Sequence, residues 1–267
     1  APLKTIAALI SAVIIRLVLT GKMGLHGIDP EAWICFSISG IMGFVIGDYF
    51  HFYSFLFLPY RVSMMVFNCG SIVTALAAWG LYGQVLQLAD WLGIGLISIG
   101  LCTVLLTRKN QSEEKAETKK MWKGIFFAAM GMLGQASGAL FSNRGMRIIE
   151  GTGVSALDAS LIRIVAGIIV LMVLLLIQKK KVEVYGALKY SRELILTGIG
   201  GTSGCAVGTT LTLQSIRYIP VGISTAIASI SPVLILLATI LFSREKIKLT
   251  EIIGTFICVA GIVALSI

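Results

Sequence analysis

The sequence contains few charged residues for its length. Asp, Glu, Lys and Arg make up 13% of the 267 residues, whereas a soluble domain carries about 25%. Residues of the AVILMFWYC set make up 57%. So little charge cannot cover the surface of a water-soluble domain of this size. The composition therefore excludes a soluble enzyme and predicts an all-α integral membrane protein, because repeated apolar stretches of about 20 residues are typical of helices that cross a bilayer.

The sequence also lacks the motifs that carry common enzyme chemistry. It has no GxxxxGK[ST] nucleotide loop, no GxSxG nucleophile elbow and no HExxH pair. The prediction is therefore a protein that is not an enzyme and has no catalytic residues, no cofactor and no ATP-driven step of its own. An intramembrane hydrolase is a weaker alternative, because it would need a nucleophile and a base placed together.

Cysteine and histidine are too sparse and too scattered to suggest a covalent framework or a metal site. There are five cysteines and two histidines, each cysteine lies inside an apolar stretch, and no CxxC spacing occurs. We therefore predict neither disulfides nor a metal ion. The net charge of +9 does not indicate a nucleic-acid partner, because the basic residues lie between apolar stretches.

Apolar runs bounded by charge, Gly or Pro predict nine membrane spans. We expect them at residues 3–20, 33–58, 62–82, 91–106, 122–141, 157–177, 194–216, 222–242 and 249–267. The one long polar interruption, residues 108–123, predicts a solvated connector between two halves of the chain.

The two halves are related by an internal repeat. Residues 33–106 align without a gap on residues 194–267 at a constant offset of 161, and glycines, serines and a proline recur in register. The matched pairs include Gly40 and Gly201, Gly43 and Gly204, Gly47 and Gly208, Ser54 and Ser215, Pro59 and Pro220, Ser63 and Ser224, Gly93 and Gly254, and Gly100 and Gly261. Five glycines and a proline in register indicate a duplication.

The repeat predicts a ten-helix bundle of two sets of five. Residues 1–107 form a first repeat of four spans, residues 108–121 a cytoplasmic connector and residues 122–267 a second repeat of five spans. The simplest explanation of the difference is that the first helix of the natural protein is missing from this chain. Because each set holds an odd number of spans, the two copies cross the membrane in opposite directions, as in inverted-repeat transporters.

Basic residues predict the orientation. The loops that contain Arg61 and residues 108–123, 178–193 and 243–248 hold fifteen Lys and Arg residues, and the opposite loops hold four. Because cytoplasmic loops are enriched in these residues, we expect 108–123 to face the cytoplasm.

The repeated pattern resembles the EamA-type members of the drug/metabolite transporter superfamily. It consists of Gly-x-x-Gly-x-x-x-Gly, a polar stretch, a proline that starts the next helix and two glycines in the last helix of each copy. Its most specific part runs from Tyr218 to Pro232 and is followed by Arg244-Glu245-Lys246 and Gly254. The resemblance covers the whole chain. It implies a ten-helix inverted-repeat bundle that moves small organic metabolites across the cytoplasmic membrane, often outward.

Asp48 is the strongest candidate for a transport site. Of the acidic residues only Asp48 lies deep in a predicted span, where a charge costs about 2.5–3.5 kcal/mol and is tolerated mainly in a bundle interior or water-filled cavity. His51 lies on the same helical face. The two residues are candidates for binding a substrate amine or a coupling proton, and the alternative is a hydrogen bond between helices that holds the bundle together.

Several uncharged groups are further candidates. Thr209 and Thr212 are the repeat partners of Asp48 and His51, and Gln214 is that of Tyr53. Thr hydroxyls also bond back to their own helix, so each of the two is more readily explained as structural. Gln135 and Asn68 are weaker candidates.

Two arginines also lie inside predicted spans. Arg16, near the end of its span, can snorkel to the membrane interface. Arg163 is a candidate for binding a substrate carboxylate or for pairing with Asp158, although a spacing of five residues is poor for an intrahelical pair.

These observations predict a secondary transporter of small metabolites such as amino acids, acting as an exporter by alternating access at a central cavity between the repeats. Its expected partners are a small-molecule substrate and membrane lipid, with protons as a candidate coupling ion and no nucleic acid. We expect it to be a multi-pass protein of the cytoplasmic membrane. The alternative with the same fold is a lipid-linked carrier or flippase.

Overall fold

The computed structural model describes residues 2–20, 27–107, 118–177, 198–231, 233–234 and 249–265. Over these residues the chain is helical and contains no strand, which confirms the all-α prediction. The predicted connector 108–121 is described only from residue 118, and the Lys-rich segment 179–181, Pro232 and Arg244-Glu245-Lys246 lie outside the described residues.

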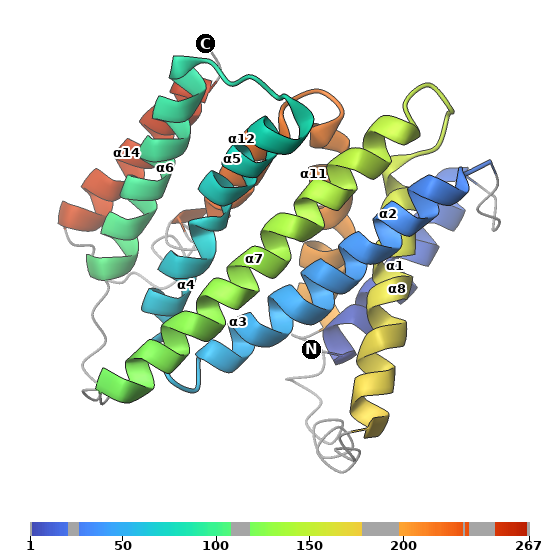
Figure 1. Ribbon diagram of the computed structural model, residues 1–267, viewed down its shortest axis with the longest axis horizontal. Helices are drawn as coiled ribbons and strands as arrows, with labels where there is room; N and C mark the ends of the chain where they lie inside the picture. The colour runs from blue at the N-terminus through green and yellow to red at the C-terminus, as the bar shows by residue number, and fades with distance from the viewer. Residues whose placement is uncertain are drawn as a thin grey trace. The chain divides into compact units, whose positions relative to one another are not determined.

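Thirteen described elements follow one another along the chain (Figure 1). They are α1 (Pro2–Thr20), α2 (Pro30–Gly40), η1 (Ile41–Gly47), α3 (Asp48–Ser54), α4 (Tyr60–Asn68), α5 (Gly70–Tyr82), α6 (Leu88–Thr107), α7 (Thr118–Ile148), α8 (Ala156–Ile177), η2 (Gly201–Gly208), α11 (Thr209–Ile216), α12 (Val221–Ala228) and α14 (Leu249–Leu265).

Several of these helices are long and apolar enough to cross a membrane. Among the described residues they are Pro30–Ser54, Val62–Tyr82, Met121–Ile148 and Ala156–Leu174, with shorter apolar helices at Thr5–Val18, Leu88–Val104 and Ile252–Leu265. Each corresponds to a predicted span. The chain is therefore a multi-pass membrane protein.

Helix α7 is longer than the predicted span at 122–141. It begins at Thr118 and continues through Ser142 and Asn143 to Ile148. The apolar-run criterion ended the span before these polar residues, but both are buried. Ser142 shares a hydrogen bond of 2.6 Å with Ser39. A hydroxyl that is hydrogen-bonded to a neighbouring helix, as that of Ser142 is, does not interrupt a membrane helix.

The repeat offset of 161 reappears in the helix boundaries. The π-helical segment η1 is matched by η2, and α4 and α12 both begin directly after a proline at the N-cap, Pro59 and Pro220. Helices α6 and α14 begin at equivalent residues, Leu88 and Leu249. The proline has no N–H to satisfy at a helix start, so it fixes these boundaries locally. The two-repeat architecture predicted from the sequence is confirmed.

The described residues form two compact units that do not coincide with the repeats. Unit 1 comprises residues 1–48 and 137–218, and unit 2 comprises residues 49–136 and 219–267. Each unit therefore contains segments of both repeats. Within unit 1, a core of small and aliphatic residues joins α1, η1, α8 and η2. Its members are Ala8, Ala12, Phe44, Leu161, Ile164, Cys205 and Ala206.

In unit 2 the last helices of the two repeats pack together as a symmetric pair. Helices α6 and α14 lie side by side (Figure 1). Gly93 faces Gly261, and Gly100 faces Gly254, so the helices run antiparallel. Gly93 therefore contacts the repeat partner of Gly100, and Gly100 contacts the repeat partner of Gly93. This is the pattern of a twofold axis perpendicular to the helices. The thiol of Cys258 lies 3.6 Å from the carbonyl oxygen of Ile97, its own repeat partner. This geometry confirms that the two copies run in opposite directions here.

We expect Gly100→Ala to destabilise the protein far more than Gly95→Ala. A Cβ at Gly100 would lie 2.6 Å from the carbonyl oxygen of Gly254 and 2.7 Å from the backbone nitrogen of Cys258, whereas a Cβ at Gly95 would meet open space. Backbone atoms cannot move aside cheaply, so the cost should be about 1–3 kcal/mol or more. Thermal unfolding of the purified variants measures the difference, and equal melting temperatures would contradict this packing.

Candidate functional site

The candidate residues predicted from the sequence are divided between the two units. Asp48, Arg163, Thr209, Thr212 and Gln214 belong to unit 1, and His51, Tyr53, Asn68 and Gln135 belong to unit 2. Unit 1 also contains both π-helical segments.

Each π-helical segment in unit 1 ends directly before a candidate polar residue. Asp48 is the first residue after η1, and Thr209 is the first residue after η2. A π-helical turn widens a helix locally and is found frequently at functional sites. Asp48 is half-buried, as is Thr209. The structure therefore gives the repeat-related polar positions the same local backbone, which the glycine pattern alone did not predict.

The threonine hydroxyls donate to their own helix. Thr209 Oγ1 donates to the carbonyl oxygen of Cys205, and Thr212 Oγ1 donates to that of Gly208 at 2.9 Å. A hydroxyl has one proton to donate, so neither residue has a donor left for a substrate, and both oxygens retain acceptor capacity. Gln214 Nε2 donates to the Tyr218 hydroxyl at 3.3 Å.

His51 is buried in unit 2 among aromatic and hydroxyl groups. Its Nδ1 lies 3.4 Å from Ser63 Oγ, and its ring stacks on Phe67 with the centroids 4.0 Å apart. Ser63 also shares a hydrogen bond with Ser54. The His51 ring thus contacts α4 through Ser63 and Phe67, and its pairing with Asp48 stays a prediction.

The other candidates of unit 2 have more ordinary surroundings. Tyr53 is 36% exposed and packs edge-on against Phe127, with ring centroids 4.8 Å apart. Asn68 Nδ2 donates to the carbonyl oxygen of Met64 at 2.7 Å, which stabilises its own helix. Gln135 is exposed. Asn68 thus bonds back to its own helix, whereas the side chains of Tyr53 and Gln135 are exposed.

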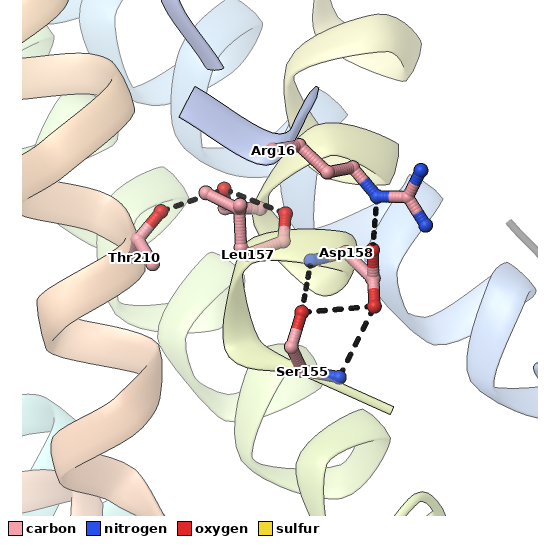
Figure 2. Close-up of polar contacts among 6 residues, drawn as sticks. Arg16, Ser155, Leu157, Asp158 and Thr210 are labelled. Atoms are coloured by element: carbon pink, nitrogen blue, oxygen red, sulfur yellow. Dashed lines mark hydrogen bonds and ion pairs between the residues drawn. The ribbon is translucent and has the colours of Figure 1, made fainter. Parts of the chain in front are cut away.

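The two span arginines have different partners from those predicted. Arg16 is buried within the protein, and its Nε lies 2.5 Å from Asp158 Oδ1 (Figure 2). Asp158 therefore pairs with Arg16 of α1 and not with Arg163 of its own helix. The physical reason is geometric, because a spacing of five residues turns Asp158 and Arg163 away from each other on α8.

Asp158 is held in place by a helix cap. Its Oδ2 accepts hydrogen bonds from the Ser155 N–H at 3.2 Å and from Ser155 Oγ at 2.8 Å, and Ser155 Oγ accepts from the Asp158 N–H at 3.1 Å (Figure 2). This is a capping box at the start of α8. The sequence Ser155-Ala-Leu-Asp158 has the spacing of a capping box, but a search for apolar runs does not detect such a motif.

Arg163 lies at the contact between α8 and η1. A Cβ at Gly40 would overlap the Arg163 backbone, so only glycine permits this approach. The Arg163 guanidinium carbon lies 5.6 Å from the centre of the Phe44 ring, and the side chain is 8% exposed. Within the described residues, Arg163 Nε is buried and has no hydrogen-bond partner.

Sequence reasoning also missed a set of hydroxyls in unit 1 that form hydrogen bonds between helices. Ser39 Oγ donates to the Gly138 carbonyl oxygen at 2.5 Å, and Ser160 Oγ shares a hydrogen bond of 2.8 Å with Thr210 Oγ1 (Figure 2). The sequence signal for such hydrogen bonds is a serine or threonine beside small residues in a membrane helix. Among the described residues, no three His, Cys, Asp or Glu side chains converge as metal ligands.

Comparisons with known proteins give the family and the fold. No curated protein matches the chain. Among solved structures, one described only as "Crystal structure of protein" matches with a TM-score of 0.73 at 17% identity, covering 100% of this chain and 89% of the other. At that identity the likeness shows the fold alone.

The family comparison matches almost the whole chain. The model described as the EamA-like transporter family matches residues 3–106 and again residues 112–267. Together with the repeat-related helices and the membrane-length spans, this match shows that the chain belongs to the EamA-like transporter family, a family of membrane transporters within the drug/metabolite transporter superfamily.

Proposed function

We propose that this protein is a secondary transporter that exports small organic metabolites, such as amino acids, across the cytoplasmic membrane. The observation that carries the proposal is the paired arrangement in unit 1, where each repeat contributes a π-helical segment followed by a polar residue. Inverted-repeat transporters bind substrate where interrupted helices of the two repeats meet.

In this proposal Asp48 is the charged group of the site. A carboxylate can accept hydrogen bonds from a substrate ammonium or can carry the coupling proton. Thr209 and Thr212 contribute hydroxyl oxygens as acceptors, since their protons are used within the helix. Gln214 is a further candidate within unit 1, and the candidates of unit 2, His51, Tyr53, Asn68 and Gln135, stay predictions from the sequence. Alternating access then requires two arrangements of the helices around these groups.

Transport by purified protein in proteoliposomes tests the proposal. We expect uptake of at least one member of a panel of labelled amino acids and sugars, above the level of empty liposomes. We also expect an imposed pH gradient to change the rate, because protons are the proposed coupling ion. Uptake of none of the panel, together with movement of fluorescent lipid between leaflets, would instead favour a lipid carrier.

A further inference from the structure

His51 is a buried titratable side chain of unit 2, inside the membrane span Pro30–Ser54. Histidine is the side chain whose charge changes near neutral pH, and ionisable residues inside a membrane are rare and often functional. From α4 the ring meets Ser63 and Phe67, neither of which is charged. On the helix faces that meet there, the titratable residues are Asp48, three residues before His51, and Tyr60, three residues before Ser63.

The hydroxyl groups beside His51 determine which of its ring nitrogens carries a proton. Ser54 Oγ donates to the carbonyl oxygen of His51 at 2.6 Å. Because a hydroxyl has one proton to donate, the hydrogen bond between Ser54 and Ser63 must use the proton of Ser63. Ser63 Oγ can then only accept from His51 Nδ1, which lies 3.4 Å away. Nδ1 is therefore the nitrogen that carries the proton in the neutral ring.

This network is satisfied in both charge states of the ring. In the neutral ring Nε2 is the nitrogen that can accept a proton. When Nε2 takes up a proton, the hydrogen bonds of Ser54 and Ser63 keep their directions. The ring also stacks on Phe67, with the centroids 4.0 Å apart, and lies 4.8 Å from the Phe55 ring. Aromatic faces attract cations, so these surroundings accept an imidazolium as well as an imidazole.

We propose that His51 is the group that binds the coupling proton, with Nδ1–H held by Ser63 and with Nε2 taking up a proton from water and returning it. This inference rests on the proposed function, because it names the group through which a pH gradient acts on transport. It assigns the coupling proton to His51 and leaves the Asp48 carboxylate for the substrate.

The first test reads the protonation of each ring nitrogen by ¹⁵N NMR. The sequence contains two histidines, so His26→Gln leaves His51 as the only labelled ring in protein made with ¹⁵N-histidine. We expect Nδ1 to keep its proton from about pH 5 to pH 8, while the Nε2 resonance shifts as that nitrogen titrates. Ser63→Ala should weaken the preference for Nδ1–H in the neutral ring. A neutral ring protonated on Nε2, or a ring that does not titrate, would overturn the proposal.

The second test measures transport in proteoliposomes with and without an imposed pH gradient, using a compound of the panel that is taken up. His51→Asn keeps an N–H donor near the position of Nδ1 but cannot take up a proton. We expect the gradient to change the rate of the native protein, whereas the two rates of His51→Asn should be equal. Ser98→Ala is the matched control: Ser98 donates to its own helix in unit 2, and the variant should respond to the gradient as the native protein does.

The outcomes separate this inference from the proposed function. If Nε2 titrates but no compound of the panel is transported, the transport proposal fails and the proton site stands. If His51→Asn responds to the gradient as the native protein does, the transport proposal stands and the assignment of His51 is overturned. A lower melting temperature of that variant would then show that the ring only holds α3 against α4. If His51→Asn does not fold, the ¹⁵N titration of the native ring decides the assignment.

Discussion

Asp48→Asn is expected to reduce transport in proteoliposomes to the level of empty liposomes. The amide keeps the shape of the side chain and removes its charge, so it can neither carry a coupling proton nor neutralise a substrate ammonium. Asp48 is half-buried directly after η1, within the span Pro30–Ser54. Stability should change by about 1 kcal/mol or less, because the amide keeps the shape of the side chain.

The experiment measures the folding of each variant as well as its transport. Each purified variant is examined by size-exclusion chromatography and thermal unfolding, and transport is expressed per folded molecule. Asp90→Asn is the matched control, because Asp90 is also half-buried but accepts a hydrogen bond from the Gln87 N–H at the start of α6. It should transport normally.

A structural role for Asp48 predicts the opposite result. Transport per folded molecule would then be normal, and expression or unfolding temperature would fall. Such a result would remove Asp48 from the site and direct the search to the uncharged groups of unit 1. Loss of pH-gradient dependence with retained exchange of substrate would instead identify Asp48 as the proton-binding group.

Arg16→Met is expected to lower the free energy of unfolding by about 3–5 kcal/mol. Breaking a buried ion pair by removing one partner leaves the other charge buried and unpaired. The side chains of Arg16 and Asp158 are 9% and 14% exposed, so water cannot readily replace the lost partner. The pair connects α1 to the start of α8 across 142 residues of sequence.

A double variant isolates the ion pair from the helix cap. Asp158→Asn keeps an oxygen that can accept from Ser155, so the capping box is largely retained. We therefore expect the double variant Arg16→Met with Asp158→Asn to recover most of the stability lost in Arg16→Met. Arg144→Met is the control, since its pair with Glu31 is about half exposed and such pairs contribute about 0–1 kcal/mol. A loss of less than about 1 kcal/mol in Arg16→Met would contradict this role.

The candidate site could be predicted from the sequence only in part. Depth in a span and repeat symmetry made Asp48 and Thr209 candidates, because both features can be counted along the chain. The partner of Asp158 could not be identified in that way, since local spacing offered Arg163 and the fold supplies Arg16. The hydroxyls of Thr209 and Thr212 were correctly expected to bond to their own helix, because that choice is local.

The sequence by itself determined the class of protein, its apolar spans and its duplication, because these depend on composition and on patterns within single segments. Proline placed the starts of α4 and α12 for the same local reason. Only the tertiary structure decided that the glycines of α6 and α14 face each other, that Ser142 and Asn143 continue α7, and that Asp158 pairs with Arg16. Each of these depends on contacts between segments far apart in the chain, which spacing along one helix does not encode.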